Sequence, residues 1–103
     1  MEKISIIVPC YKEEAALPYF WEETSKVASE MKIKYSGLSF EYIFVDDGSS
    51  DGTLRVLKEL AAENREVKYV SFSRNFGHQC AVTAGLKFAT GDAIVIIDAD
   101  LQD

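Results

Sequence analysis

The sequence contains little cysteine and no long hydrophobic run. Its two cysteines, Cys10 and Cys80, lie too far apart for a C-x-x-C metal or redox motif, and we interpret both as small packing residues. The longest aliphatic stretch, 93–97, is far shorter than the roughly 20 residues that a membrane-spanning helix needs. We therefore expect a reduced, cytoplasmic compartment, with membrane attachment only through segments outside this chain.

Positive charge is also scarce. Eleven lysines and arginines stand against seventeen aspartates and glutamates, which gives a net charge of -6 and leaves no basic cluster. Nonspecific binding to nucleic acid depends on a basic surface, so it has little electrostatic support here, and we expect no nucleic-acid partner. The hydrophobic share of 48% and the charged share of 27% are ordinary for a globular protein. We expect residues 1–103 to form a single unit.

Several ligand-binding motifs are missing. No G-x-G-x-x-G follows the first predicted strand and no G-x-x-x-x-G-K-[ST] occurs, so a dinucleotide site or a P-loop is a weak interpretation. The segment "DADLQD" lacks the glycine of a calcium-binding EF-hand loop. A phosphate-signalling receiver domain resembles "VDDGS" superficially, but it would present its acidic pair after the first strand rather than after the second.

Hydrophobic patterning predicts an alternation of strands and helices. We predict strands at 4–8, 40–45, 67–72 and 93–97, and helices at about 17–31, 53–63 and 79–89. The strand at 93–97 lacks apolar and polar alternation, which is typical of a strand buried on both faces. The strand at 67–72 alternates and is expected to be more peripheral. Pro9 is expected to halt the first strand.

The helix at 53–63 carries two further expectations. Ser50 or Asp51 can cap its start, because short polar side chains accept hydrogen bonds from the first N–H groups of a helix. Its buried face is predicted to consist of four aliphatic residues: Leu54, Leu57, Leu60 and Ala61.

The alternation predicts an α/β fold of the Rossmann-like type. Short connections between strands and helices favour right-handed crossovers, a parallel sheet in the order 3-2-1-4 and helices on both faces. Ligands bind such sheets at the carboxyl ends of the strands. Residues that follow the strands should therefore share one rim, namely 9–13, 46–47, 73–78 and 98–103.

The acidic residues of this rim are the first candidates for chemistry. Asp98 and Asp100 lie two positions apart in an extended segment, so both side chains point to the same side. Two close carboxylates favour a divalent cation, and oxygen ligands suit Mg²⁺ or Mn²⁺. The spacing alone equally allows Asp98 to cap a turn and Asp100 to be solvated. The pair Asp46 and Asp47 before Gly48 is a turn signal, with a ligand role as an additional possibility.

Two basic side chains of the rim are also candidates. His78 is the only histidine, and we favour a structural role or a phosphate contact for it over a metal ligand. Arg74 is the better candidate for a nucleotide phosphate, because its planar guanidinium matches the phosphate oxygens.

Four ordered motifs give the chain a family resemblance. The segments "SIIVPCYKEE", "YIFVDDGSSDGT", "SFSRNFGHQCAVTAGLKFATGD" and "IIDADLQD" together resemble the N-terminal half of a family 2 glycosyltransferase with the GT-A fold. The resemblance is strongest to bacterial polyprenyl-phosphate (bactoprenol) glucosyltransferases and weaker to dolichyl-phosphate mannose synthases. It covers nearly the whole chain.

The resemblance implies roles for individual residues. The nucleotide's base and ribose would meet residues of the first and second motifs: Pro9, Tyr11, Glu13, Val45 and Asp47. The ribose, metal and diphosphate would meet Asp98, Ala99 and Asp100, with Gln102 near the sugar or diphosphate. Asp98 and Asp100 would be the catalytic and metal-binding pair. The family usually has asparagine where Lys12 stands.

The implied reaction is transfer of a hexose from a nucleoside-diphosphate sugar, with UDP-glucose favoured, to polyprenyl phosphate with a divalent cation. Four alternatives stay open: GDP-mannose as donor, a glycan acceptor, a nucleotide-binding segment without activity, and a structural or interaction segment without a ligand. In this family the acceptor side and the membrane helices lie downstream. We therefore expect the 103 residues to be a donor-binding half, truncated after the D-x-D motif. That half is expected to be inactive alone and to self-associate. The full-length protein is expected at the inner face of the cell membrane.

Overall fold

The computed structural model describes residues 2–99. Four parallel strands form one sheet in the order β3-β2-β1-β4, which confirms the predicted order and strand direction. The strands and helices alternate along the chain as β1 (Glu2–Cys10), α1 (Ala16–Lys34), β2 (Leu38–Asp46), α2 (Thr53–Glu63), β3 (Val67–Ser71), α3 (His78–Phe88) and β4 (Ala93–Ile96).

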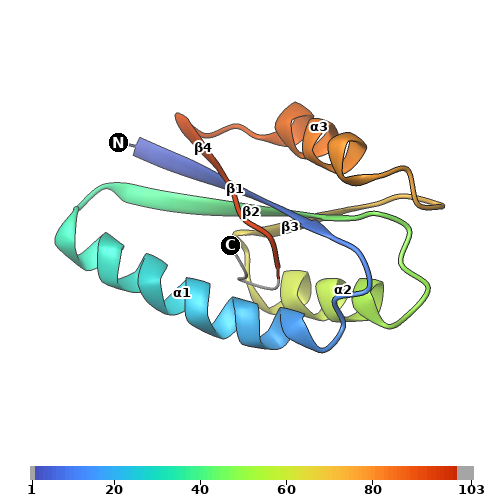
Figure 1. The fold of residues 1–103 in the computed structure, drawn as a ribbon. Helices are drawn as coiled ribbons and strands as arrows, with labels where there is room; N and C mark the ends of the chain where they lie inside the picture. The colour runs from blue at the N-terminus through green and yellow to red at the C-terminus, as the bar shows by residue number, and fades with distance from the viewer. Residues whose placement is uncertain (1, 100–103) are drawn as a thin grey trace.

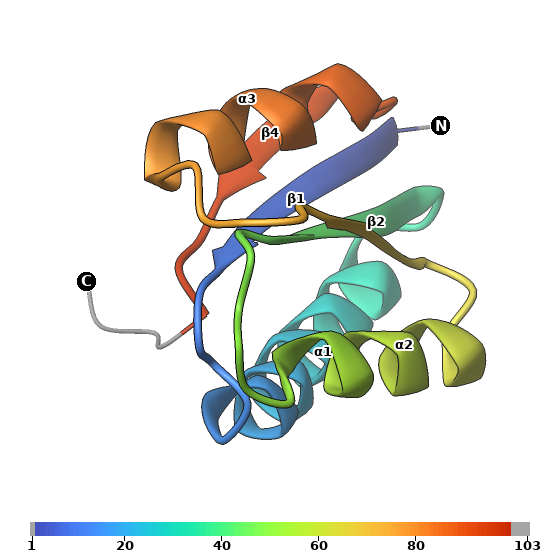
Figure 2. The same ribbon diagram turned by 90° about the vertical axis from the view of Figure 1, so that its right-hand side faces the viewer.

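Helices cover both faces of the sheet, as predicted. Helices α1 and α2 lie on one face and α3 lies on the other (Figures 1 and 2). Successive residues of β2 supply the two faces in turn. Tyr42 and Phe44 enter the larger hydrophobic core under α1 and α2, and Ile43 and Val45 pack with Ala81 of α3. The smaller α3 layer therefore depends on a few tightly packed side chains.

Strand β1 continues through Pro9, so the expectation that Pro9 halts it was wrong. The backbone carbonyl of Cys10 accepts a hydrogen bond from Asp47 N at 2.8 Å, on the β2 side. The carbonyl of Ile7 accepts from Ile97 N at 3.0 Å, on the β4 side. Because alternate residues point to opposite neighbours, Pro9 faces the β4 side, beyond the last β1–β4 pair. Ile97 N donates to Ile7 O, and the next bond of this ladder would come from the N–H of residue 9, which proline lacks. Proline therefore ends the β1–β4 ladder there, while the β1–β2 ladder continues to Cys10.

The start of α2 is only partly as predicted. Gly52 precedes the first helical residue and offers no side-chain cap. The Asp51 carboxylate instead accepts a hydrogen bond from Thr53 N at 3.0 Å, and the hydrogen bonds from Thr53 lower the pKa of Asp51. Asp51 thus holds the first helical residue, whereas Ser50 makes no such contact in the hydrogen bonds found among residues 2–99.

The buried face of α2 also differs from the prediction by one position. Leu57 and Leu60 are buried as expected, but Val56 takes the place expected for Leu54. Leu54 lies instead on a shallow outer hollow. Helical spacing allows either residue beside Leu57 and Leu60, and the packing against β2 and β3 decides between them.

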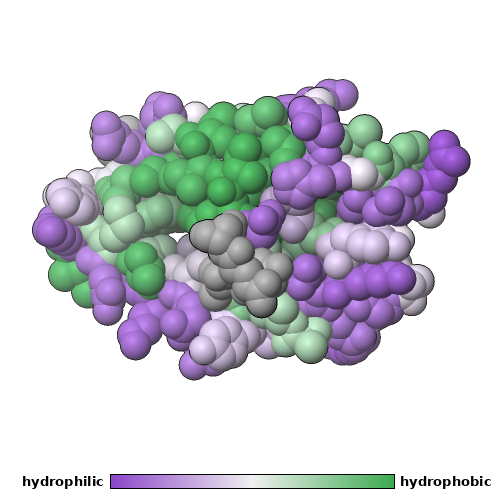
Figure 3. All heavy atoms as spheres, viewed as in Figure 1, coloured by the Kyte–Doolittle hydropathy of each residue, from purple (hydrophilic) through white to green (hydrophobic). Residues whose placement is uncertain are grey.

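Strand β4 was expected to be buried on both faces, and this was wrong. The exposed fractions of Ile94, Val95 and Ile96 are 45%, 42% and 47%. The strand lies at the edge of the sheet and pairs only with β1 among the described strands, while α3 packs mainly over β1 and β2. Apolar surface is consequently open around β4 (Figure 3).

A groove continues this apolar surface toward α1. It has a volume of about 350 Å³, and we call it the α1–β4 groove. Its apolar lining comes from α1 and from the face of the sheet that α1 covers, and includes Ile4, Ile6, Val27, Ala28, Met31, Phe40, Val95 and Ile97. Within residues 2–99, no helix is both long and apolar enough to cross a membrane.

A buried carboxylate secures the connection between α3 and β4. Glu41 of β2 is 2% exposed and accepts hydrogen bonds from Ser5 Oγ, from Thr90 N at 2.6 Å and from Lys68 Nζ at 2.9 Å. Lys3 Nζ lies 3.6 Å from the same carboxylate. Burial alone would raise the pKa of Glu41, but the hydrogen bonds from Ser5, Thr90 and Lys68 lower it to about 2.

Candidate functional site

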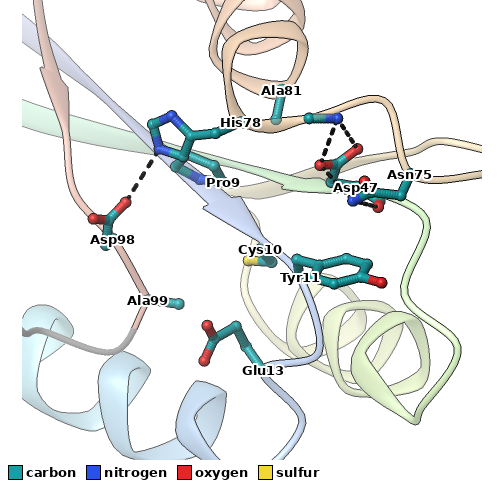
Figure 4. A pocket seen from close by; sticks show the side chains of 11 residues that line it. Pro9, Cys10, Tyr11, Glu13, Asp47, Asn75, His78, Ala81, Asp98 and Ala99 are labelled. Atoms are coloured by element: carbon teal, nitrogen blue, oxygen red, sulfur yellow. Dashed lines mark hydrogen bonds and ion pairs between the residues drawn. The ribbon is translucent and has the colours of Figure 1, made fainter.

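A cavity of about 380 Å³ lies at the carboxyl ends of the strands, where the sequence predicted a ligand-binding rim. Figure 4 shows its side chains, which come from all three βα connections of the sheet and from the segment after β4. The lining residues are Pro9, Cys10, Tyr11, Glu13, Asp47, Asn75, Gly77, His78, Ala81, Asp98 and Ala99.

The loop after β1 is tied to the loop after β2. Lys12 N donates to Ser49 Oγ at 2.8 Å, and Glu13 N donates to Thr53 Oγ1 at 2.9 Å. These bonds fix the backbone that carries Tyr11 and Glu13 into the cavity. Lys12 has a left-handed backbone with φ of 56°. Asparagine adopts this conformation more readily than most residues, so the backbone here would also suit the asparagine expected from the family resemblance.

Asp47 joins the loop after β2 to the loop before α3. Its carboxylate accepts hydrogen bonds from Phe76 N at 2.8 Å, Gly77 N at 3.0 Å and Asn75 Nδ2 at 2.9 Å. Asn75 Nδ2 also donates to the backbone carbonyl of Asp47 at 3.0 Å. Asp47 is 4% exposed, so much of its hydrogen-bonding capacity is used inside the protein. It lines the cavity as predicted, and it also holds the adjoining segment 75–77 that lines the cavity beside it.

Gly48 lets the same two loops come into direct contact. Its φ is +71°, and a Cβ built on it would lie 2.1 Å from the backbone carbon of Arg74 and 2.4 Å from Asn75 N. Any larger residue would collide with backbone that cannot move aside freely. The turn signal in the sequence therefore marks a contact between loops as well as a change of direction.

Asp98 and His78 face each other across the other end of the cavity. His78 Nε2 lies 3.4 Å from Asp98 Oδ1, and both side chains are largely open to solvent. His78 is the first residue of α3, and Asp98 lies two residues after the end of β4. The rim prediction therefore brought Asp47 and Asp98 into one cavity, as expected. The contact between His78 and Asp98 was not predicted.

Cys10 lies at the floor of the cavity with its thiol buried. Burial, and then the nearby negative charges of Glu13 and Asp46, raise the pKa of the Cys10 thiol well above its usual range. The thiol is therefore protonated at neutral pH and is no nucleophile, in agreement with a packing role. Cys80 was expected to pack as well, but it is exposed on α3 because that helix turns only a narrow face to the sheet.

Of four further residues with predicted site roles, two lie outside the cavity lining and two lie outside the described residues. Val45 is fully buried and packs in the small core under α3. The Arg74 guanidinium lies 4.6 Å from the centre of the Phe76 ring, outside the cavity lining. Asp100 and Gln102 lie outside the described residues.

Asn75, Gly77 and Ala81 line the cavity but were not singled out in the sequence. Asn75 and Gly77 stand in the segment "RNFGH" of the third motif, to which the resemblance assigned no residue roles. Their link to Asp47 spans about thirty positions in the chain and depends on strand order. The rim argument placed their loop correctly, yet it could not say which of its residues face the ligand.

The described residues offer limited ligation for a metal ion. Between residues 2 and 99, no group of three or more His, Cys, Asp or Glu side chains is placed to hold one. Asp98 is a half-exposed carboxylate on the cavity wall. Mg²⁺ is commonly held by one or two carboxylates together with substrate phosphates and water. The donor set therefore fits a cation shared with a bound phosphate group, and does not fit a self-sufficient protein site.

Two solved structures with the same fold were determined with nucleotide ligands. TarS of Staphylococcus aureus in complex with UDP matches with a TM-score of 0.75 and 26% identity, over 95% of this chain and 27% of that chain. The mannosyltransferase PcManGT of Pyrobaculum calidifontis, solved with GDP-Man and Mn²⁺, matches with a TM-score of 0.72 and 27% identity, over 96% of this chain and 28% of that chain. The sheet and its covering helices thus have the GT-A glycosyltransferase fold.

The chain belongs to the family described as Glycosyl transferase family 2, whose profile matches residues 5–103. An uncharacterized glycosyltransferase of Bacillus subtilis, YkcC, is 46% identical over 99 residues, which are 96% of this chain and 29% of that protein. A prophage bactoprenol glucosyl transferase homolog of Escherichia coli is 45% identical over 101 residues, which are 98% of this chain and 31% of that protein. The chain thus spans about a third of these relatives.

Proposed function

We propose that this chain binds the nucleoside-diphosphate sugar of a hexosyltransferase that acts on polyprenyl phosphate. The observation that carries the proposal is the convergence of Tyr11, Glu13, Asp47 and Asp98 on one cavity at the sheet rim. The glycosyltransferase family supports the reaction type. The similarity to bactoprenol glucosyl transferases favours glucose as the sugar, UDP as its carrier and a lipid phosphate as the acceptor.

The two ends of the cavity suit different parts of the donor. Tyr11 presents an exposed aromatic ring, and a nucleotide base can stack on such a ring. Pro9 and Glu13 adjoin this ring and are assigned to the base and the ribose. Asp98 and Ala99 lie at the other end, toward the diphosphate, with Asp100 and Gln102 assigned to the diphosphate and the sugar.

A divalent cation, Mg²⁺ or Mn²⁺, is part of the proposal. When bound, it supplies Lewis-acid stabilisation of the negative charge on the departing diphosphate. Asp98 would hold it together with Asp100 and oxygens of the diphosphate. The protein has a net charge of -6, so the carboxylates alone would repel a diphosphate. Binding of the donor is therefore expected to require the cation.

The acceptor chemistry makes modest demands on the protein. A lipid phosphate is an anion at neutral pH, so its oxygen can attack the sugar without first losing a proton to a general base. A polyprenyl acceptor resides in a membrane, and we therefore assign the full-length protein to the cytoplasmic face of the cell membrane.

Calorimetric titration of the 103-residue chain with UDP-glucose tests the proposal. We expect binding in the presence of Mn²⁺ and at least tenfold weaker binding with EDTA. Asp98→Asn should weaken binding at least tenfold as well, because it removes the charge that holds the cation. Asp92→Asn is the matched control, since Asp92 lies just before β4, away from the cavity, and accepts a hydrogen bond from Lys3 N.

Two outcomes would overturn the proposal. One is the absence of any nucleotide binding by a folded chain, and the other is binding that neither EDTA nor Asp98→Asn weakens. The same preparation should form no labelled lipid from labelled UDP-glucose, Mn²⁺ and polyprenyl phosphate, because the cavity accounts for the donor alone. Positioning of the acceptor can contribute several kcal/mol to catalysis, and no acceptor site is recognised among the described residues.

A further inference from the structure

The side chain of Asn75 is held in one orientation at the cavity wall. Its amide nitrogen carries two hydrogens, and both have acceptors on Asp47. One is the backbone carbonyl at 3.0 Å, and the other is carboxylate Oδ2 at 2.9 Å. Turning the amide over would place Asn75 Oδ1 against two acceptors, which is unfavourable. Asp47 therefore determines the orientation of the Asn75 amide, and Asn75 Oδ1 points away from Asp47.

Asp47 is itself held in place, so the orientation of Asn75 rests on a firm support. Backbone N–H groups of Phe76 and Gly77 bind the Asp47 carboxylate at 2.8 and 3.0 Å. The backbone of Asn75 also lies directly against Gly48, with no space for a side chain between them. Asn75 Oδ1 makes no hydrogen bond among those found within residues 2–99, and Asn75 lines the cavity.

Asn75 lies at the end of the cavity that suits a base. In Figure 4, Tyr11 lies on the same side of the cavity as Asp47 and Asn75, whereas Asp98 and His78 lie across from them. A cation and a diphosphate belong with Asp98. A base that stacks on Tyr11 would therefore present its edge toward Asn75 and Asp47. This step rests on the proposed function, because it takes a nucleotide as the ligand.

We propose that Asn75 determines base specificity by accepting a hydrogen bond from a ring N–H of uracil or guanine. Uracil carries a hydrogen on N3 and guanine on N1, and either can donate to Asn75 Oδ1. Cytosine and adenine have lone pairs at the corresponding ring nitrogens, which would face the Oδ1 lone pairs. A polar group that is left unpaired or opposed in a binding site costs enough to give strong discrimination.

Titration of the 103-residue chain with UDP, GDP, CDP and ADP in the presence of Mn²⁺ is the test. We expect UDP or GDP to bind at least tenfold more tightly than both CDP and ADP. Methylation of the ring nitrogen, as in N3-methyl-UDP or N1-methyl-GDP, should remove that advantage on the wild-type protein. This ligand-side change does not depend on whether a protein variant folds.

Asn75→Ala should weaken binding of the preferred nucleotide, so that the four diphosphates bind with affinities within about twofold of one another. Asn64→Ala is the matched control, because Asn64 also uses its amide nitrogen, on Leu60 O at the end of α2, far from the cavity. Equal binding of all four diphosphates would overturn the Asn75 role and leave the proposed function intact. A base preference that persists after both the methylation and Asn75→Ala would also overturn the Asn75 role. Failure of every diphosphate to bind would overturn both proposals.

Discussion

At the scale of single residues, several positions of the rim are determined by backbone contact rather than by chemistry. Gly48 has a left-handed backbone and lies against the backbone of Arg74 and Asn75. Gly37, in the turn after α1, has a similar φ of +88°, yet no atom lies within 4 Å of the position of its missing Cβ. Substitution of Gly37 therefore measures the cost of backbone strain alone, whereas substitution of Gly48 adds the cost of a collision between loops.

We expect Gly48→Ala to destabilise the protein much more than Gly37→Ala. The strain of a left-handed alanine is about 1–2 kcal/mol, and Gly37→Ala should cost that amount alone. Gly48→Ala adds a contact of 2.1 Å with backbone, so its cost should exceed 3 kcal/mol. Urea unfolding of both variants measures the difference. Equal losses of stability would show that the loops separate easily, contrary to the geometry.

Single residues also show where sequence reasoning reached its limit. The rim prediction correctly placed Tyr11, Glu13, Asp47 and Asp98 together, because strand order alone decides which loops are neighbours. It did not identify Asn75, whose importance comes from two hydrogen bonds to a distant residue. Such a pairing has no local signature, so it can be found only when the two loops are seen in contact.

At the scale of elements, the sequence predicted every helix and strand but not their surroundings. Periodicity reports how a segment is patterned, and it placed all seven elements within a few residues of their observed bounds. It does not report what covers them. The aliphatic run of β4 has the pattern of a buried strand, yet its exposed fractions exceed 40% because its outer edge has no partner among the described strands.

Glu41 connects three elements, and its charge should be worth a measurable amount of stability. It holds β1 through Ser5, β3 through Lys68 and the α3–β4 connection through Thr90. We expect Glu41→Gln to lower the free energy of unfolding by about 1–3 kcal/mol at pH 7, because buried charged hydrogen bonds are lost. Glu59→Gln is the control, since Glu59 forms an exposed ion pair within α2 and should change stability little.

The effect of Glu41→Gln should depend on pH in a defined direction. The pKa of Glu41 is about 2 in the folded protein, below its ordinary value of 4.5. Its contribution to stability is therefore fully present above pH 4.5 and is lost as the pH falls toward 2. Urea unfolding at pH 7 and at pH 2.5 should show the variant approaching the wild type. A difference that persists unchanged at pH 2.5 would contradict an ionic origin.

At the scale of the whole molecule, the two open edges of the sheet are unequal. Strand β3 ends the sheet on one side and carries Lys68, a charged residue of the kind that protects edges. Strand β4 ends the other side with four apolar residues, Ala93–Ile96, beside the apolar α1–β4 groove. Unpaired backbone groups next to apolar surface favour addition of another strand.

We therefore expect the 103-residue chain to self-associate through β4, with a second copy as the partner. Sedimentation velocity at about 100 μM should show dimers or larger species. Higher salt should strengthen the association by screening the net charge of -6. Ile94→Lys combined with Ile96→Lys should restore the monomer, whereas Tyr69→Lys on the β3 edge should not. A wild-type monomer at this concentration, or equal effects at both edges, would exclude β4 as the interface.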